Sequence, residues 1–315
     1  MKEEILKVAL AQRASLHDRD SNMDALLGDI RSAAAAGAAL ILLPELHNSD
    51  YFCQVEQTAN FDLAEPVPGP STAQLAAVAA EAGIVVVASL FEKRATGLYH
   101  NTAVVLDSDG SIAGKYRKMH IPDDPGYHEK FYFTPGDLGF MPIETSLGKL
   151  GVLVCWDQWY PEAARLMALA GADLLLYPTA IGWDSRDDEE ERQRQLDAWI
   201  TVQRGHAVAN GLPVLACNRN GIEAAPSGKG PGIAFWGNSF VCGPQGEWLA
   251  RAGLQAETLL VDLDLGFLRE SCNIFLIRDP RDMLPSLSVQ LPEPRLADHD
   301  LGDAQAVSDR PNGED

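Results

Sequence analysis

The sequence predicts an α/β protein built on mixed β-sheets. Short apolar runs typical of strands alternate with longer stretches typical of helices along most of the chain. The turn pair Asp109-Gly110 lies between two strand-like runs and predicts a hairpin, whose strands pair antiparallel. No linker rich in Pro, Gly or Ser interrupts the pattern before residue 289, and 315 residues suffice for one large core. We therefore expect one folded domain over residues 1–288.

The elements of the N-terminal half follow from their residues. Residues 6–11 form a short β-rich run, and residues 22–36 contain many alanines, which favour a helix, before Gly37 ends it. Residues 40–43 are all apolar and predict a buried strand. A second helix is expected at residues 72–82. The remaining strands of this half are expected at residues 84–89, 101–106 and 112–117.

In the C-terminal half, residues 151–154 form an apolar strand that ends on Cys155. A helix is expected at residues 161–170, since proline is well tolerated in the first helical position. Two further β-rich runs, at residues 174–177 and 214–217, predict two more strands.

Glu45, Lys118 and Cys155 each stand at the end of an expected strand. A thiol with a pKa near its free value of roughly 8.5 is mostly unreactive at neutral pH, and becomes a nucleophile beside a base or a cation. A shielded carboxylate can take the thiol proton, and an ammonium can stabilise the oxyanion on an attacked carbonyl. The three residues therefore predict acyl transfer to cysteine followed by hydrolysis.

At these residues the chain resembles the nitrilase, or carbon-nitrogen hydrolase, superfamily, over residues 5–285. Its signature is a Glu-Lys-Cys triad in this order. The segments that carry the resemblance are residues 43–46, 116–120, 129–137 and 151–162. The resemblance implies a four-layer αββα sandwich with two packed mixed sheets, and it implies a homo-oligomer.

Taken singly, each residue has a simpler interpretation. Cys155 could be a core thiol, Glu45 a loop cap and Lys118 part of a solvated cationic edge, but the ordered set favours catalysis. Glu129 matches a second glutamate that the family keeps near its triad, and the alternative is a surface partner of Lys130. Nearby histidines would suit a proton shuttle but are more often structural partners, so His120 and His128 are not assigned to catalysis. The other cysteines are expected in the core: Cys53, Cys217, Cys242 and Cys272.

The residues after Cys155 indicate a branch of the family. Residues 156–162 closely resemble enzymes that hydrolyse N-carbamoylputrescine. In the branch that acts on N-carbamoyl-D-amino acids, arginines close behind the cysteine hold the substrate carboxylate. This chain has Gln158 and Trp159 there, so that clamp is missing.

The predicted substrate has a neutral ureido head, an apolar middle and a terminal ammonium, so its site needs a polar pocket, an apolar sleeve and an anionic end. Tryptophans are candidates for the apolar sleeve, Trp236 among them, and aspartates are candidates for the anionic end, Asp188 among them. For residues 188–191 a solvated helix start is the alternative, because acids favour the N-terminal helix dipole. The expected substrate contacts are Trp156, Gln158, Trp159, Trp183, Asp184 and Asp187.

The composition limits the partners and the compartment. A net charge of −20 opposes binding to nucleic acid and to anionic membranes but permits a small cationic ureido substrate. Residues 289–315 carry seven acidic and two basic residues with little apolar content, and predict a disordered acidic tail. Five cysteines without paired spacing, and no signal peptide or membrane-length apolar run, favour a cytoplasmic protein. The chemistry needs no cofactor, and no metal-ligand spacing is found.

Two alternatives stay open. One is a related amidase or nitrilase with a different substrate, which a panel of ureido, amide and nitrile compounds would separate. The other is a catalytically silent binding scaffold, against which the intact set of Glu45, Lys118 and Cys155 argues.

Overall fold

Two six-stranded sheets form the centre of the protein, in a computed structural model that describes residues 5–184, 186–226, 228 and 232–266. The first sheet is built from β1 (Ile5–Gln12), β2 (Leu40–Leu42), β3 (Val85–Ala95), β4 (Leu98–Leu106), β5 (Ile112–Arg117) and β15 (Glu257–Asp264). The second is built from β6 (Ile143–Thr145), β7 (Gly148–Val152), β8 (Leu174–Thr179), β10 (Val214–Asn218), β13 (Phe240–Cys242) and β14 (Trp248–Arg251). A small third sheet contains β9 (Gly182–Asp184), β11 (Asn220–Glu223) and β12 (Ile233–Trp236).

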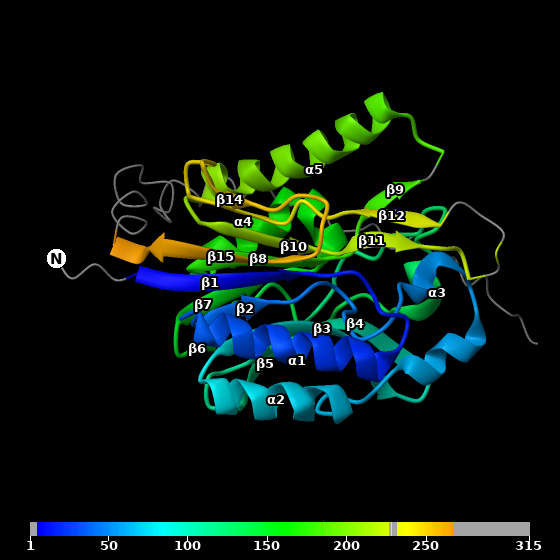
Figure 1. The fold of residues 1–315 in the computed structure, drawn as a ribbon, viewed down its shortest axis with the longest axis horizontal. Coiled ribbons are helices and arrows are strands. Elements are labelled where there is room, and N and C mark those ends of the chain that lie inside the picture. The colour runs from blue at the N-terminus through cyan, green and yellow to red at the C-terminus, as the bar shows by residue number, and fades with distance from the viewer. Residues whose placement is uncertain (1–4, 185, 227, 229–231, 267–315) are drawn as a thin grey trace, which may run out of the picture. The chain divides into compact units, whose positions relative to one another are not determined.

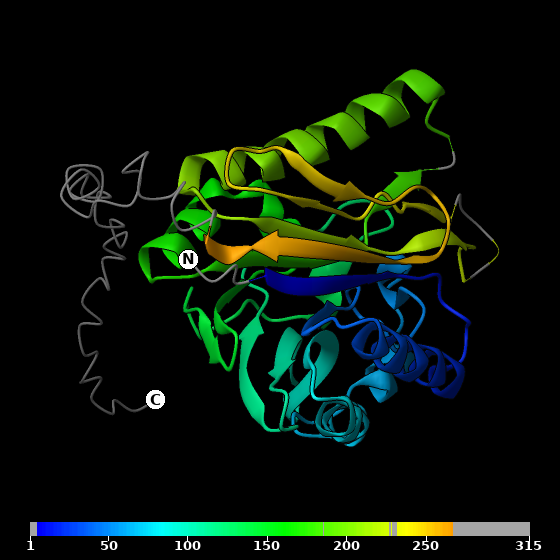
Figure 2. The ribbon, with the colours of Figure 1, turned by 60° about the vertical axis from the view of Figure 1, so that its left-hand side comes forward.

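Both large sheets are mixed, as the hairpin signal predicted. Their strand orders are β15-β1-β2-β3-β4-β5 and β14-β13-β10-β8-β7-β6. In the first sheet β1, β2 and β3 run parallel, whereas β4 pairs antiparallel with both β3 and β5. In the second, β7, β8 and β10 run parallel, and antiparallel strands flank them. The strands β1 and β15, blue and orange in Figures 1 and 2, pair along their whole length although they come from opposite ends of the described chain.

Helices cover the outer face of each sheet. The helices α1 (Arg19–Ala35) and α2 (Pro70–Ala82) pack on the first sheet, and α4 (Pro161–Leu169) and α5 (Glu189–Asn210) pack on the second (Figures 1 and 2). The predicted four-layer αββα sandwich is therefore confirmed.

The alternation of residues along β1 explains how the layers hold together. Val8 and Leu10 join the core between the two sheets, whereas Ala9 and Ala11 join the core under α1 and α2. All four are completely buried. A strand covered on both faces needs apolar residues at every position, so the short continuous run is the expected sequence for this place.

The predicted elements are present, with differences at their ends. The first helix begins at Arg19 rather than residue 22, because the Asp18 side chain caps it by accepting a 2.9 Å hydrogen bond from the Ser21 N–H. β3 extends past residue 89 to Ala95 and turns into β4 at Gly97, whose φ of 74° favours glycine.

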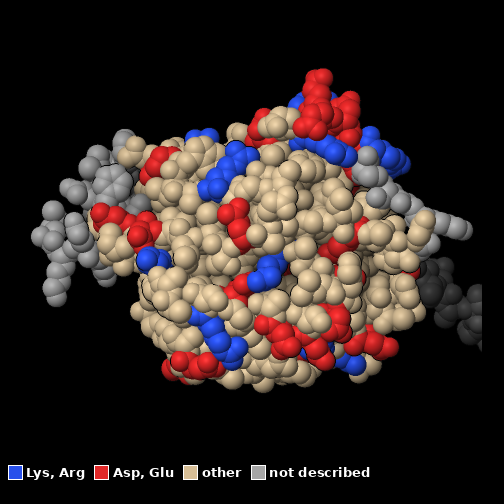
Figure 3. Space-filling model, viewed as in Figure 1, with Lys and Arg blue, Asp and Glu red and all other residues tan. Residues whose placement is uncertain are grey.

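The long helix α5 was predicted only by its start. Asp188 caps it by accepting a 2.8 Å hydrogen bond from the Glu191 N–H, as the helix-start alternative predicted for residues 188–191. Figure 3 shows the acidic side chains gathered over this end of α5. These acids therefore have a structural role at the helix terminus.

The predictions for the cysteines and for the C-terminal segment have different outcomes. Cys53, Cys217 and Cys242 are buried free thiols, which confirms their expected place in the core. Cys272, the domain boundary at residue 288 and the acidic tail at 289–315 lie outside the described residues. Over the described ranges, no helix combines the length and apolar character needed to cross a membrane.

Candidate active site

The three candidate catalytic residues come from strand ends of both sheets. Glu45 follows β2 and Lys118 follows β5, in the first sheet; Cys155 follows β7 in the second and begins a 3-10 helix, η3 (Cys155–Trp159). The backbone N–H of Glu45 donates to the carbonyl of Thr179 at the end of β8, at 3.3 Å, and so joins the two sheets. Carboxyl ends of parallel strands commonly form such sites, because the side chains that follow them lie along one edge.

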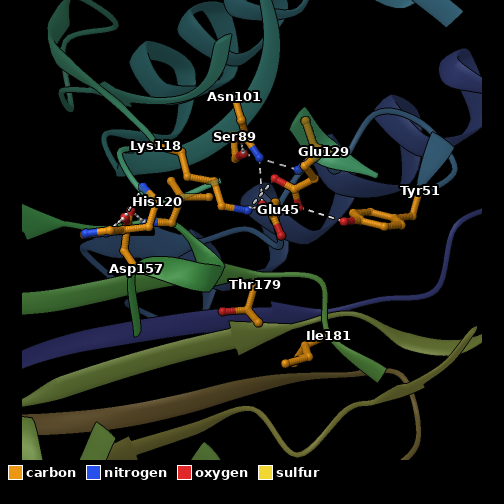
Figure 4. Close-up of polar contacts among 12 residues, drawn as sticks. Glu45, Tyr51, Ser89, Asn101, Lys118, His120, Glu129, Asp157, Thr179 and Ile181 are labelled. Carbon is orange, nitrogen blue, oxygen red and sulfur yellow. Dashed lines mark hydrogen bonds and ion pairs between the residues drawn. The ribbon is translucent and has the colours of Figure 1, made fainter. Parts of the chain in front are cut away.

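The Lys118 ammonium lies between two carboxylates, and all three side chains are buried. Its Nζ donates to Glu45 Oε1 at 2.8 Å and to Glu129 Oε2 at 2.7 Å (Figure 4). Each carboxylate has a further donor. Asn101 Nδ2 donates to Glu45 Oε1, and the Tyr51 hydroxyl donates to Glu129 Oε1, both at 2.7 Å. Glu129, at the start of the short helix α3 (Glu129–Tyr132), therefore lies beside Glu45 and Lys118.

The second carboxylate oxygen of Glu45, Oε2, is available to accept a proton. Glu45 Oε2 is buried and accepts no hydrogen bond within the described part of the chain. Buried carboxylate oxygens are nearly always hydrogen-bonded, so one without a partner calls for an explanation. A proton acceptor for a neighbouring thiol provides that explanation.

The charges of this cluster act on one another. Burial raises the pKa of the Cys155 thiol well above its usual range, and the Glu45 charge adds to this while Lys118 opposes it. Burial works against the Lys118 ammonium, but Glu129 and Glu45 outweigh it and raise the Lys118 pKa. Burial also raises the pKa of Glu129 to about 7, against the opposing effect of Lys118. The resting thiol is therefore protonated at neutral pH and needs a base when it attacks.

The backbone at Cys155 has an unusual conformation. Its φ is 42°, in the left-handed region that side chains other than glycine rarely adopt, and such residues persist where surrounding contacts hold them. Asp157 supplies such contacts: Oδ2 accepts from the Val154 N–H and from the Tyr116 hydroxyl, both at 2.9 Å. Its Oδ1 lies 2.7 Å from Nδ1 of His120, so His120 has a structural partner two residues from Lys118.

Gly136, in the segment matched to the family, supports the end of β5. Its N–H donates to the Lys118 carbonyl at 2.9 Å, and a Cβ added here would lie 2.0 Å from the Arg117 carbonyl oxygen. Only glycine allows this approach of the two backbones. The glycine thus holds the main chain of Lys118 in place.

We expect Gly136→Ala to lower the free energy of unfolding by about 1–3 kcal/mol, the usual cost of overpacking. Because the displaced backbone carries Lys118, alkylation of Cys155 by iodoacetamide should also slow by about tenfold or more, as expected when a catalytic group moves by about 1 Å. Urea unfolding and peptide mapping would measure the two effects. Gly28→Ala on α1, where the added Cβ meets open space, is the matched control. Normal Cys155 reactivity in Gly136→Ala would contradict the positioning of Lys118 by this contact.

Two of the expected substrate contacts line a cavity. Trp183 and Asp184 lie on the wall of a cavity of about 130 Å³, together with Tyr127. The Tyr127 hydroxyl is bonded to both backbone groups of Gly182, at 3.0 and 3.1 Å. Burial raises the pKa of Tyr127, and the charges of Cys155 and the two carboxylates raise it further. The Tyr127 ring packs against that of Tyr51, with centroids 5.5 Å apart, and the Tyr51 hydroxyl binds Glu129, so Tyr127 lies between the cavity and the charged cluster.

The other expected contacts have structural partners, and their contact with substrate stays a prediction. Gln158 is fully buried, and its Oε1 accepts from Trp199 Nε1 at 2.7 Å, which ties η3 to α5. Asp187 accepts from Gln195 on α5 at 3.2 Å. Trp156 and Trp159 pack edge to face with centroids 6.2 Å apart. Trp236 packs between two other indoles, those of Trp183 and Trp199.

Some polar residues of this site were missed. Asn101 and Tyr51 hold the two carboxylates, but each lies in a stretch whose sequence shows only a strand or an aromatic neighbourhood. Arg219 was not given a role either. Among the described residues, no group of three or more His, Cys, Asp or Glu side chains could hold a metal ion.

The sequence pattern of the carbon-nitrogen hydrolase family matches residues 7–271. The N-carbamoylputrescine amidase of Solanum lycopersicum is 44% identical over 268 residues, which cover 84% of this chain and 88% of that protein. The citrullinase of Francisella tularensis is 42% identical over 256 residues, covering 81% and 87%. The crystal structure of a carbon-nitrogen hydrolase from Helicobacter pylori G27 is similar with a TM-score of 0.86 at 50% identity, over 90% of this chain and 98% of that one.

Proposed function

This chain belongs to the carbon-nitrogen hydrolase family, and from that membership and the site we propose that it hydrolyses N-carbamoylputrescine to putrescine, carbon dioxide and ammonia. The observation that carries the chemistry is the free oxygen of Glu45, buried in the same charged cluster as Lys118 and Cys155. The substrate is supported by the missing arginine clamp after Cys155 and by the identity to the tomato amidase.

Catalysis begins at the thiol. Sγ of Cys155 attacks the ureido carbon, and the thiol proton passes to Oε2 of Glu45. The developing oxyanion is stabilised by the Lys118 ammonium, which uses two of its three protons to bind carboxylates, and by the backbone N–H of Trp156. Because the thiol is protonated at rest, this proton transfer accompanies the attack.

The second half of the reaction reverses the role of the base. Glu45 returns the proton to the departing amine, and the carbonyl group stays on sulfur as a thioester-like intermediate. Glu45 then removes a proton from water, which attacks this carbon, and the thiolate leaves and takes that proton back. The carbamic acid released in this step breaks down to carbon dioxide and the second amine. Glu129, hydrogen-bonded to Lys118 on its other side, keeps the ammonium in position throughout.

The distal end of the substrate lies in the cavity lined by Tyr127, Trp183 and Asp184. Trp183 provides an apolar wall, and Asp184 provides the negative charge for the terminal ammonium. Asp184 is paired with Arg186, whose Nε lies 2.9 Å from Oδ1. Because Arg186 is largely exposed, it can release Asp184 into solvent contact at little cost.

The same pair favours a second candidate, citrulline. A carboxylate and a guanidinium at one cavity match the ammonium and the carboxylate of an α-amino acid, and the chain is 42% identical to a citrullinase. If kcat/KM is higher for citrulline than for N-carbamoylputrescine, citrulline becomes the assigned substrate. The chemistry at Cys155 is the same for both compounds.

We expect N-carbamoylputrescine to be hydrolysed at least about a hundredfold better than N-carbamoyl-γ-aminobutyrate, measured as kcat/KM by ammonia release. A desolvated carboxylate facing Asp184 costs several kcal/mol, and roughly 1.4 kcal/mol corresponds to a factor of ten. Asp184→Asn should reduce this preference, whereas Arg186→Gln, the control for the same ion pair, should not. Equal kcat/KM for the two compounds would contradict the selection of a cationic substrate, and the protein would then be a general amidase.

A further inference from the structure

Arg219 holds the backbone that carries Glu45. It lies between β10 and β11, and only 2% of it is exposed. Its Nε and Nη2 donate to the Glu45 carbonyl at 3.1 and 3.0 Å, and Nη2 also donates to the Leu46 carbonyl. This buried arginine therefore binds the main-chain carbonyls of Glu45, whose side chain binds Lys118, and of Leu46.

The held segment is conformationally unusual. Leu46 has a φ of 49°, in the left-handed region, and its N–H donates to Ser89 Oγ at 3.3 Å. A non-glycine residue keeps this conformation only where its surroundings fix it. Arg219 on one side and Ser89 on the other provide these contacts, so the direction in which Glu45 leaves the strand depends on them.

The same arginine reaches the second carboxylate through Glu223. Arg219 Nη1 lies 2.9 Å from Glu223 Oε1, and Glu223 Oε2 accepts from the Tyr51 N–H at 2.7 Å. The hydroxyl of the same tyrosine donates to Glu129. A closed ring of hydrogen bonds therefore runs from Arg219 through Glu45, Lys118, Glu129, Tyr51 and Glu223 back to Arg219.

We propose that Arg219 and Glu223 are positioning residues that fix the two carboxylates on either side of the Lys118 ammonium and keep Oε2 of Glu45 directed at the thiol. In this role the pair acts through Glu45 and Tyr51, not directly on the substrate or on the thiol. The inference rests on the proposed hydrolase chemistry, but not on the identity of the substrate.

The chemistry of the pair supports this role over a purely stabilising one. A buried ion pair contributes little net stability compared with apolar residues of the same volume, because both charges lose their hydration. Its strength is directional, since a planar guanidinium fixes several acceptors at once. In this ring the acceptors are the two carbonyls beside the base and the carboxylate that holds Tyr51.

The test uses two mild substitutions in the full-length protein, Arg219→Lys and Glu223→Gln. Lysine keeps the charge but cannot bond both carbonyls and Glu223 together, and glutamine keeps the shape but loses the charge. We expect each variant to lower kcat on N-carbamoylputrescine by at least tenfold, with KM changed by less than threefold, after correction for the active fraction. Arg13→Lys is the matched control, because Arg13 also holds a carboxylate, that of Asp29 on α1.

A second measurement does not need the substrate. Iodoacetamide alkylates the thiol: a sulfur–carbon bond forms, iodide leaves, and the thiol proton passes to Glu45. We expect the alkylation of Cys155, followed by peptide mass, to slow at least tenfold in both variants and to stay within twofold of the parent in Arg13→Lys.

The outcomes separate the two proposals. A parent enzyme inactive on N-carbamoylputrescine, with slowed alkylation in the variants, would reject the substrate and retain the positioning pair. Alkylation within threefold of the parent in both variants would overturn the positioning role. So would a loss of activity fully explained by a smaller folded fraction in thermal unfolding.

Discussion

Cys155→Ser is expected to lower kcat on N-carbamoylputrescine by a factor on the order of 10⁴ or more, while the fold stays intact. Removing a nucleophile that acts together with a base costs at least this much in comparable hydrolases. A hydroxyl is much harder to deprotonate than a thiol, and Glu45 is a weak base for it. Steady-state ammonia release and thermal unfolding of parent and variant would measure both quantities.

The control for this substitution is Cys242→Ser. Cys242 is another completely buried thiol, on β13, so its replacement tests the general cost of a buried hydroxyl. We expect it to keep kcat within threefold of the parent. Turnover of Cys155→Ser within tenfold of the parent would reject the thiol mechanism, as would the failure to trap any substrate-derived adduct on Cys155 by mass spectrometry.

Glu45→Gln and Lys118→Ala are each expected to lower kcat by about a thousandfold, and the double variant by much less than the product. The reason is structural: both groups share the hydrogen bond from Nζ to Oε1, at 2.8 Å, so removing either one misplaces the other. Residues that act as a unit give such non-additive losses. Single-turnover rates of the three variants would measure this.

The matched control for the lysine is Lys115→Ala. Lys115 lies on β5, three residues before Lys118, and pairs with a buried carboxylate, that of Glu92 at 2.8 Å. We expect a loss of kcat below threefold. If the losses from Glu45→Gln and Lys118→Ala multiply in the double variant, the two residues act independently and do not work as a unit.

Much of the fold could be predicted because single segments carry their own signals. The run from Val8 to Ala11 in β1 is apolar at every position, which fits a strand covered on both faces, and the Asp109-Gly110 turn specifies the hairpin of β4 and β5. The helix α5 was harder to predict. Over its 22 residues the buried side chains include Gln203, His206 and Asn210, so the apolar stripe that identifies a helix is interrupted by polar residues with buried partners.

The site was predictable as far as strand ends could be recognised. Glu45, Lys118 and Cys155 each follow a strand, and the carboxyl ends of parallel strands place such residues along one edge. The contacts of Arg219 and Asn101 gave no such signal. Arg219 bonds a carbonyl 174 residues away, and Asn101 bonds a carboxylate 56 residues away, so only the folded chain brings these groups together.

The division of the active groups between two sheets has an evolutionary consequence. Glu45 and Lys118 belong to one layer and Cys155 to the other, so the distance between base and nucleophile is set by the thickness of the apolar filling between the layers. A methylene gained or lost by Leu42 or Val152, which end the strands before Glu45 and Cys155, changes that thickness. Selection on turnover therefore acts on the volume of the core, and the interior of this protein is free to vary only in combinations that keep the two sheets equally far apart.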